Sequence, residues 1–132
     1  MQNIKTALIT GGSKGIGFGV AIALINDGIK VAITARNKSE VEIAAENLNK
    51  IRPGYAMGFS ADVADLSAQE AVVQQILTDW GRLDYVIANA GVGHFAPIQD
   101  LTPAQWQETM DINLTGVFNS IKASYLALKQ TK

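Results

Sequence analysis

The chain of 132 residues contains no cysteine, which excludes disulfide bonds, thiol catalysis and thiolate metal sites. The absence of cysteine fits a reducing compartment, and we expect a cytoplasmic protein with no metal site. Charge of one sign is also missing, because 11 Lys and Arg residues face 12 Asp and Glu residues for a net charge of −1. A balance of this kind argues against nucleic acid or an anionic membrane surface as a partner.

Long hydrophobic runs are absent as well. No apolar stretch approaches the roughly 18 residues that a membrane-spanning helix needs. The first residues, Met1 to Lys5, lead straight into a predicted strand, so we expect no signal peptide. What the chain does have is a composition that is 48% hydrophobic, enough for a buried core. Its length suits one domain, which we place over residues 1–132.

Strand-like and helix-like segments alternate along the whole chain. Apolar runs bounded by Gly, Pro or Asn predict strands at Thr6–Thr10, Lys30–Thr34, Tyr55–Ser60 and Leu83–Ala88. Helical periodicity predicts helices at Gly15–Asp27, Lys38–Lys50, Ser67–Trp80 and Pro103–Lys129.

This alternation predicts an α/β fold with a doubly wound parallel sheet. The first strand is expected in the centre, with the second and third strands to one side and the fourth to the other. A ligand crevice is then expected at the carboxyl ends of the first and fourth strands, where the strand order reverses.

Two helix starts carry capping signals. Ser67 with Glu70 fits a capping box, and Thr102 followed by Pro103 fits an N-cap with proline at the first helical position. The helix that Ser67 would open has apolar or amphipathic residues at helical spacing, which predicts one buried face. The residues of this predicted face are Ala71, Val72, Gln75, Ile76 and Trp80.

The segment from Thr10 to Gly17 reads TGGSKGIG and joins the first strand to the first helix. A strand that ends in a glycine-rich turn opening a helix is suited to cradle a pyrophosphate at the helix N-terminus. Gly11 with Gly12 permits the tight turn, Gly15 a close approach of phosphate, and Gly17 close packing of helix on sheet. The spacing is G-x-x-x-G-x-G rather than the commoner G-x-G-x-x-G, and an ordinary turn is the alternative.

Three further motifs follow the later strands and the last helix. Asp62-Val63 follows the third strand, where a carboxylate could accept a hydrogen bond from an adenine amino group; a plain loop aspartate is the alternative. Asn89-Ala90-Gly91 follows the fourth strand and reads either as a cofactor-side loop or as an Asn-Gly turn. Asn113 lies within the last helix, where Asn and a nearby Gly conflict with helix propensity and suggest a functional site.

Together these motifs resemble the short-chain dehydrogenase/reductase family over the whole chain. Within the family, the sequence is most similar to the branch of 3-oxoacyl-carrier-protein reductases and carbonyl reductases. The resemblance implies a three-layer Rossmann fold that is incomplete here, with about four strands and four helices and the C-terminal strands absent. It also implies a dinucleotide cofactor and a small carbonyl or alcohol substrate.

The resemblance implies a role for each matching residue. Gly11, Gly15 and Gly17 would hold the pyrophosphate, and Ser13, Lys14 and Ile16 would line the same loop. Asp62 and Val63 would contact the adenine, by carboxylate and backbone respectively. Asn89, Ala90 and Gly91 would flank the cofactor ribose. Asn113 would distort its helix and hold a water in a proton relay.

The end of the second strand bears on the choice of cofactor. NAD sites commonly place an acid there, but the sequence reads Thr34-Ala35-Arg36-Asn37. The guanidinium of Arg36 suits a phosphate, and Lys14 adds a second cation, so we predict NADP(H) rather than NAD(H). The alternative is that both cations are solvated surface charges.

The resemblance implies that family members continue beyond Lys132, with a catalytic serine on the next strand and a Tyr-x-x-x-Lys pair on the next helix. Tyr125 and Lys129 have that spacing, but they lie in the same predicted helix as Asn113, so we interpret the spacing as a chance occurrence. We therefore expect the chain by itself to be inactive. His94, the only histidine, either borders a substrate mouth or is polar surface.

Three functions remain open. The chain is the cofactor-binding part of a reductase, a nucleotide-binding module without chemistry, or an interaction module that pairs with itself or with a full-length relative. The last strand would be an open sheet edge, and the last helix carries much apolar surface, so we expect a homo-oligomer.

Overall fold

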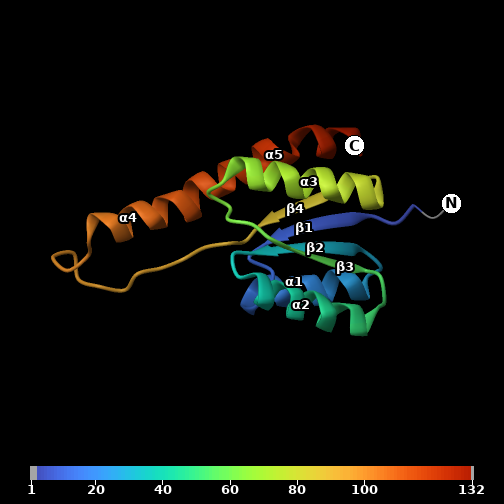
Figure 1. Cartoon of the computed structure of the whole chain (residues 1–132), viewed down its shortest axis with the longest axis horizontal. Helices are drawn as coiled ribbons and strands as arrows, with labels where there is room; N and C mark the ends of the chain where they lie inside the picture. The colour runs from blue at the N-terminus through green and yellow to red at the C-terminus, as the bar shows by residue number, and fades with distance from the viewer. Residues whose placement is uncertain (1–2, 132) are drawn as a thin grey trace.

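Four parallel strands form one sheet in the computed structural model, which describes residues 3–131 (Figure 1). They are β1 (Thr6–Thr10), β2 (Lys30–Ala35), β3 (Ala56–Ser60) and β4 (Tyr85–Ala88). The strand order is β3-β2-β1-β4, which confirms the predicted position of the first strand between the second and the fourth.

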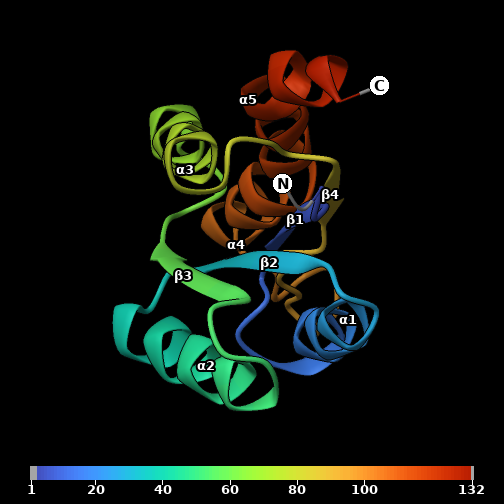
Figure 2. The ribbon, with the colours of Figure 1, turned by 90° about the vertical axis from the view of Figure 1, so that its right-hand side faces the viewer.

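Helices cover both faces of this sheet. Figure 2, which looks along the strands, shows α1 and α2 on one side and α3 and α5 on the other, so the three predicted layers are present. The described helices are α1 (Gly15–Asn26), α2 (Lys38–Ile51), α3 (Leu66–Trp80), α4 (Pro103–Met110) and α5 (Gly116–Gln130), with a π-helical segment, η1 (Asp111–Thr115), between the last two.

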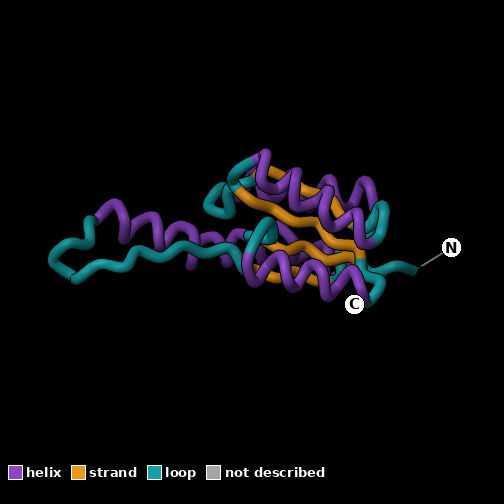
Figure 3. Tube along the Cα trace, turned by 90° about the horizontal axis from the view of Figure 1, so that it is seen from below, coloured by secondary structure: helices purple, strands orange, loops and turns teal. Residues whose placement is uncertain are grey.

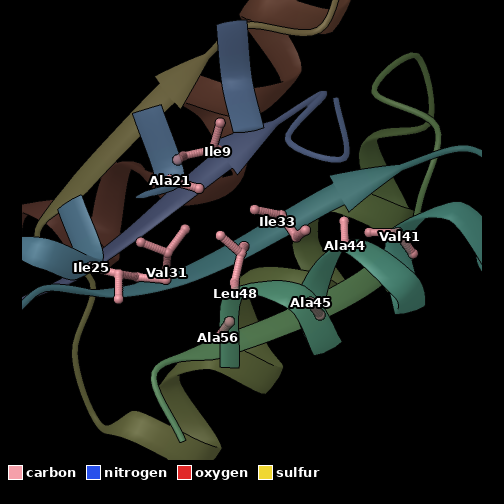
Figure 4. Close-up of a cluster of buried hydrophobic side chains, with 10 residues drawn as sticks. All are labelled: Ile9, Ala21, Ile25, Val31, Ile33, Val41, Ala44, Ala45, Leu48 and Ala56. Carbon is pink, nitrogen blue, oxygen red and sulfur yellow. The ribbon is translucent and has the colours of Figure 1, made fainter. Parts of the chain in front are cut away.

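The core is divided by the sheet because side chains of a strand alternate between its faces. Ile9 and Ile33 pack toward α1 and α2, whereas Leu8 and Ala32 pack toward α3 and α5. All four are at most 1% exposed. Figure 4 shows the cluster on the α1 and α2 side, made of Ile9, Ala21, Ile25, Val31, Ile33, Val41, Ala44, Ala45, Leu48 and Ala56.

The fourth strand begins two residues later than predicted, at Tyr85 rather than Leu83. The side chain of Asp84 explains the difference, because its Oδ2 accepts the N–H of Thr6 at 2.9 Å in place of a backbone carbonyl. The N–H of Asp84 in turn donates to the carbonyl of Thr6 at 2.9 Å. The Asp84 side chain thus takes the place of a backbone carbonyl in the first hydrogen bond between β1 and this segment.

The predicted N-cap of α3 is wrong, although the helix begins within one residue of its predicted start. Asp65, not Ser67, is the N-cap, and its Oδ1 accepts the N–H of Ala68 at 3.2 Å. Both residue types cap helices well, but the chain already turns at Asp65, whose N–H donates to the carbonyl of Asp62 at 3.0 Å. The other prediction is confirmed, since Thr102 forms a capping box with Gln105 ahead of α4.

The predicted buried face of α3 is partly wrong. Val72 and Ile76 are buried as expected, but Ala71 and Gln75 are exposed. Gln69 and Val73 are buried in their place. The apolar face therefore starts with a polar residue that periodicity alone did not indicate.

The segment that the sequence predicted as one long helix is α4, η1 and α5 in succession. The π-helical turn contains Asn113, which confirms that the helix is distorted at this residue. Figure 3 shows α4 and the loop before it extending away from the sheet, beyond the carboxyl ends of the strands.

Candidate functional site

A cleft of about 350 Å³ lies at the carboxyl ends of the strands, where the crevice was predicted. The loops after β1, β2, β3 and β4 all contribute to its walls. Most of the predicted site residues line it, namely Gly11, Ser13, Lys14, Arg36, Asp62, Val63, Asn89, Ala90 and Gly91. Gly15, Ile16, Gly17 and Asn113 do not line it directly.

Sequence reasoning missed several lining residues. They are Thr34, Ala35, Asn37, Glu40, Ala61, Val92 and Ile112. For Glu40 a signal was present, because it lies in the first turn of the helix that follows β2. A side chain there faces the same crevice as the end of β2. The others lie at strand ends, in loops or, for Ile112, in η1, and no motif of the sequence singles them out.

The glycines of the first loop meet different geometric demands. Gly11 and Gly15 have φ angles of +65° and +60°, which side chains other than glycine rarely adopt. At Gly17 the demand is space, because an added Cβ would collide with the carbonyl oxygen of Gly11 and come within 2.6 Å of Asn89 Nδ2. The start of α1 thus packs directly against the loops after β1 and β4.

The N-terminus of α1 differs from those of the other helices that begin from a loop. Asn37, Asp65 and Thr102 cap α2, α3 and α4 with their side chains. The N-cap of α1 is Lys14, whose side chain makes no capping hydrogen bond. The first N–H groups of α1 are therefore left for another acceptor, and the helix dipole favours an anion there.

Hydrogen bonds join the loops after β1 and β4. The hydroxyl oxygen of Thr10 accepts the N–H groups of Asn89 and Ala90, each at 3.1 Å. The amide of Asn89 donates to the carbonyl of Gly11 at 3.1 Å. Asn89 and Thr10 therefore hold the two loops together, and Thr10 was not among the predicted site residues.

Charged side chains of both signs face the cleft. Lys14 and Arg36 contribute two cations, and neither forms an ion pair within residues 3–131. Glu40 and Asp62 contribute two carboxylates. Oδ1 of Asp62 accepts the N–H of Ala64 at 2.9 Å, so this carboxylate is held by the turn that follows it.

Asn113 pairs with the backbone of Val92 on the wall of the cleft. Its Oδ1 accepts the Val92 N–H and its Nδ2 donates to the Val92 carbonyl, both at 2.8 Å. A Cβ on the neighbouring Gly91 would lie 3.3 Å from Asn113 Oδ1. The side chain is thus committed to holding the loop after β4, and the proton relay implied by the resemblance stays a prediction.

Two other candidates lie outside the cleft. Nε2 of His94 is 3.3 Å from Oε1 of Glu108, across the projecting loop and α4. Tyr125 and Lys129 line a second hollow with Lys5 and Tyr85, at the amino ends of β1 and β4. The Tyr-x-x-x-Lys pair is therefore at the opposite end of the sheet from the cleft.

The family model for short chain dehydrogenases matches residues 5–132, almost the entire chain. The chain belongs to this family. Within it, 3-oxoacyl-[acyl-carrier-protein] reductase FabG of Staphylococcus aureus is 33% identical over 132 residues, covering 98% of this chain and 53% of the relative. The chain spans about half the length of the curated relatives it matches.

Solved structures of the family agree with the fold. Alcohol dehydrogenase from the archaeon Thermococcus sibiricus, solved with 5-hydroxy-NADP, superposes with a TM-score of 0.90 at 34% identity. That match covers 98% of this chain and 55% of the archaeal chain. NAD⁺-bound xylitol dehydrogenase superposes with a TM-score of 0.90 at 29% identity, over 96% and 49% of the two chains.

Residues 3–131 contain neither a cluster of metal ligands nor a membrane-spanning helix. No group of three or more His, Asp or Glu side chains is placed to hold a metal ion. Among the described helices, none is long and apolar enough to cross a membrane.

Proposed function

We propose that this chain is the NADP(H)-binding part of a short-chain dehydrogenase or reductase. The observation that carries the proposal is the cleft at the carboxyl ends of β1 and β4, which meets the uncapped N-terminus of α1. The positive φ of Gly11 and the close packing of Gly17 form a cradle that suits a pyrophosphate. The cofactor supplies hydride transfer, and the whole protein would use it on a small carbonyl or a secondary alcohol.

Each part of the cleft has a proposed task. Backbone N–H groups at the start of α1, near Gly15, Ile16 and Gly17, bind the pyrophosphate. The carboxylate of Asp62 accepts a hydrogen bond from the adenine amino group. The backbone of Val63 lies against the adenine ring. The loop from Asn89 to Gly91 borders the ribose. Asn113 keeps this loop in place through Val92.

The choice of NADP(H) rests on the charges at the end of β2. Arg36 lines the cleft without an ionic partner in residues 3–131, and Lys14 faces it from the loop after β1. A guanidinium fork matches a 2′-phosphate, whereas an NAD site favours an acid on the ribose hydroxyls. Glu40 opposes a phosphate, so the two cations must outweigh it. The relatives include one solved with an NADP derivative and one with NAD⁺, so the charges of this chain decide the proposal.

Parallel titrations of NADPH and NADH test this proposal. A charge-assisted hydrogen bond is worth about 1.5–3 kcal/mol, so NADPH should bind roughly 10- to 100-fold more tightly. Arg36→Ala should bring the two affinities close together, while Arg52→Ala, which removes an arginine stacked on Tyr55 outside the cleft, should leave the preference intact. Equal affinities in the unchanged protein would overturn the NADP(H) assignment, and failure to bind either would overturn dinucleotide binding.

A second candidate function is a binding module without turnover. The observation that favours it is the position of Tyr125 and Lys129 at the far end of the sheet, while the cleft is lined by no tyrosine among the described residues. We therefore expect this chain by itself to bind NADPH without oxidising it in the presence of small ketones. NADPH oxidation that disappears in Tyr125→Phe would contradict this expectation.

A further inference from the structure

A buried polar network lies behind the adenine side of the cleft, between α3 and α5. Gln69, Asn119 and Ser120 are 3%, 5% and 1% exposed. The amide nitrogens of Gln69 and Asn119 both donate to the carbonyl of Val63, at 2.7 and 3.0 Å. Val63 follows Asp62 in the loop after β3, so two helices anchor this loop from inside the molecule.

The orientation of the Gln69 amide is fixed. Its nitrogen faces two carbonyl oxygens, those of Val63 at 2.7 Å and Gly116 at 3.2 Å, and its oxygen accepts the hydroxyl of Ser120 at 2.8 Å. A flipped amide would place its oxygen against both carbonyls. Because a buried polar group without a partner is costly, the observed orientation is the only satisfied one.

The anchored carbonyl belongs to the same peptide unit that holds the Asp62 carboxylate. The N–H of this unit is that of Ala64, which donates to Oδ1 of Asp62 at 2.9 Å. A peptide unit is planar, so fixing the direction of its carbonyl also fixes the direction of its N–H. Hydrogen bonds accepted by the carbonyl also polarise the unit and strengthen the N–H as a donor.

A simpler residue would satisfy packing at this position. Val72, Val73 and Ile76 make up the rest of the buried face of α3, and an aliphatic side chain would extend it without any polar group to satisfy. An amide buried among aliphatic residues is explained only by a function that an aliphatic side chain cannot perform. The hydrogen bond to the Val63 carbonyl is such a task.

From this geometry we infer that Gln69 is a positioning residue for the adenine-reading carboxylate of Asp62. It acts through the Val63–Ala64 peptide, with Asn119 as a second support. The inference rests on the proposed function, because it requires an adenine dinucleotide in the cleft. It adds the residues that give the site its preference for adenine over other bases.

The test compares two cofactors that differ at the base alone, NADPH and its hypoxanthine analogue. Hypoxanthine has a carbonyl oxygen where adenine has the amino group, so the 6-position no longer donates a hydrogen bond to Asp62 and instead presents an acceptor to the carboxylate. The unchanged protein should bind NADPH about tenfold more tightly than the analogue, as expected for one charge-assisted hydrogen bond. In Gln69→Leu the two affinities should come within about twofold of each other, because the carboxylate is no longer aimed.

Val73→Ala is the matched control. It removes buried volume from the same face of α3 and destabilises the fold without touching the Val63 carbonyl. A merely structural role of Gln69 would weaken both cofactors equally, as Val73→Ala should, and leave their ratio unchanged. Asn119→Ala removes one of the two donors to the Val63 carbonyl and should partially reduce the ratio of the affinities for NADPH and the analogue. This variant tests the inference independently if Gln69→Leu does not fold.

The outcomes are distinguishable. A ratio near one in Gln69→Leu, or a reduced ratio in Asn119→Ala, with an intact ratio in Val73→Ala, supports the inference. A ratio that survives in the Gln69 and Asn119 variants, or that is already near one in the unchanged protein, overturns the inference and leaves cofactor binding standing. Absence of binding to both cofactors in the unchanged protein overturns the proposed function and the inference together.

Discussion

Gly17 and Gly19 stand two residues apart in α1 but are held by different constraints. An added Cβ at Gly17 would meet the Gly11 carbonyl and Asn89, whereas one at Gly19 would meet nothing within 4 Å. Gly17→Ala should lower the free energy of unfolding by about 1–3 kcal/mol through overpacking. Gly19→Ala should raise it by about 0.5–1 kcal/mol, because alanine favours the helix. Urea unfolding of the pair checks both signs, and equal effects would contradict the proposed close packing.

Asp84, at the amino ends of the strands, makes the stability of the protein depend on pH. Burial by itself would raise the pKa of this carboxyl, but hydrogen bonds from Arg82 and from the Thr6 N–H, with the charges of Arg82 and Lys5, outweigh it. The net pKa is lowered from its ordinary value of 3.8. Nε of Arg82 donates to Oδ2 of Asp84 at 2.8 Å.

A lowered pKa means that the unfolded chain takes up the proton at a higher pH than the folded protein. The stabilisation is therefore fully present above pH 3.8 and is lost as pH falls through the lower folded value. The difference in unfolding free energy between the unchanged protein and Asp84→Asn should be largest near pH 6 and shrink below the ordinary value. Asp79→Asn, at an exposed position of α3, is the control. A difference that stays constant from pH 6 to pH 3 would contradict the assignment.

At the scale of elements, the π-helical turn η1 connects the projecting helix α4 to the loop after β4. Asn113 makes this connection with two hydrogen bonds to Val92. Asn113→Ala should cost about 1–2 kcal/mol of local stability, speed hydrogen exchange of the Val92 amide about tenfold and expose residues 91–102 to protease. Gln107→Ala, which breaks a hydrogen bond to Asp111 along the same helical run, is the control and should leave the loop unchanged.

Elements also differ in how well the sequence predicts them. Hydrophobic periodicity and turn residues gave every strand and most helix ends to within two residues, since those signals act within a few positions of the chain. The cap of α3 was wrong because Asp65 and Ser67 are both good caps. The hydrogen bond from the Asp65 N–H to the Asp62 carbonyl places the turn at Asp65 and makes it the cap, and the capping signals in the sequence did not indicate this contact.

At the scale of the whole molecule, α5 carries an exposed apolar stripe and the sheet ends in an open edge at β4. Leu114, Phe118, Ile121 and Tyr125 follow helical spacing and are 56–65% exposed. In the described sheet β4 is an edge strand, with one side of its backbone unpaired. Exposed apolar stripes and open edges favour association, so we expect a dimer or larger species at micromolar concentration.

Sedimentation velocity tests this expectation. Ile121→Lys places a charge in the stripe and should shift the population toward monomer. Ile51→Lys places the same charge at the end of α2, on the opposite face of the sheet, and should leave the distribution unchanged. A monomeric unchanged protein would contradict self-association and would leave the cofactor proposal unaffected.

The sequence by itself determined the order of strands and helices, the parallel sheet and the glycine-rich loop, because these depend on periodicity and turn residues within short windows. It also indicated most of the residues that line the cleft, since loops at the carboxyl ends of parallel strands must meet. Only the tertiary structure decided that Thr10 joins two loops and that Gln69 is buried against Val63. Each of these depends on a contact between segments that packing brings together, and the hydrogen-bonding partner of a polar side chain is fixed only when the helices and sheet have taken their places.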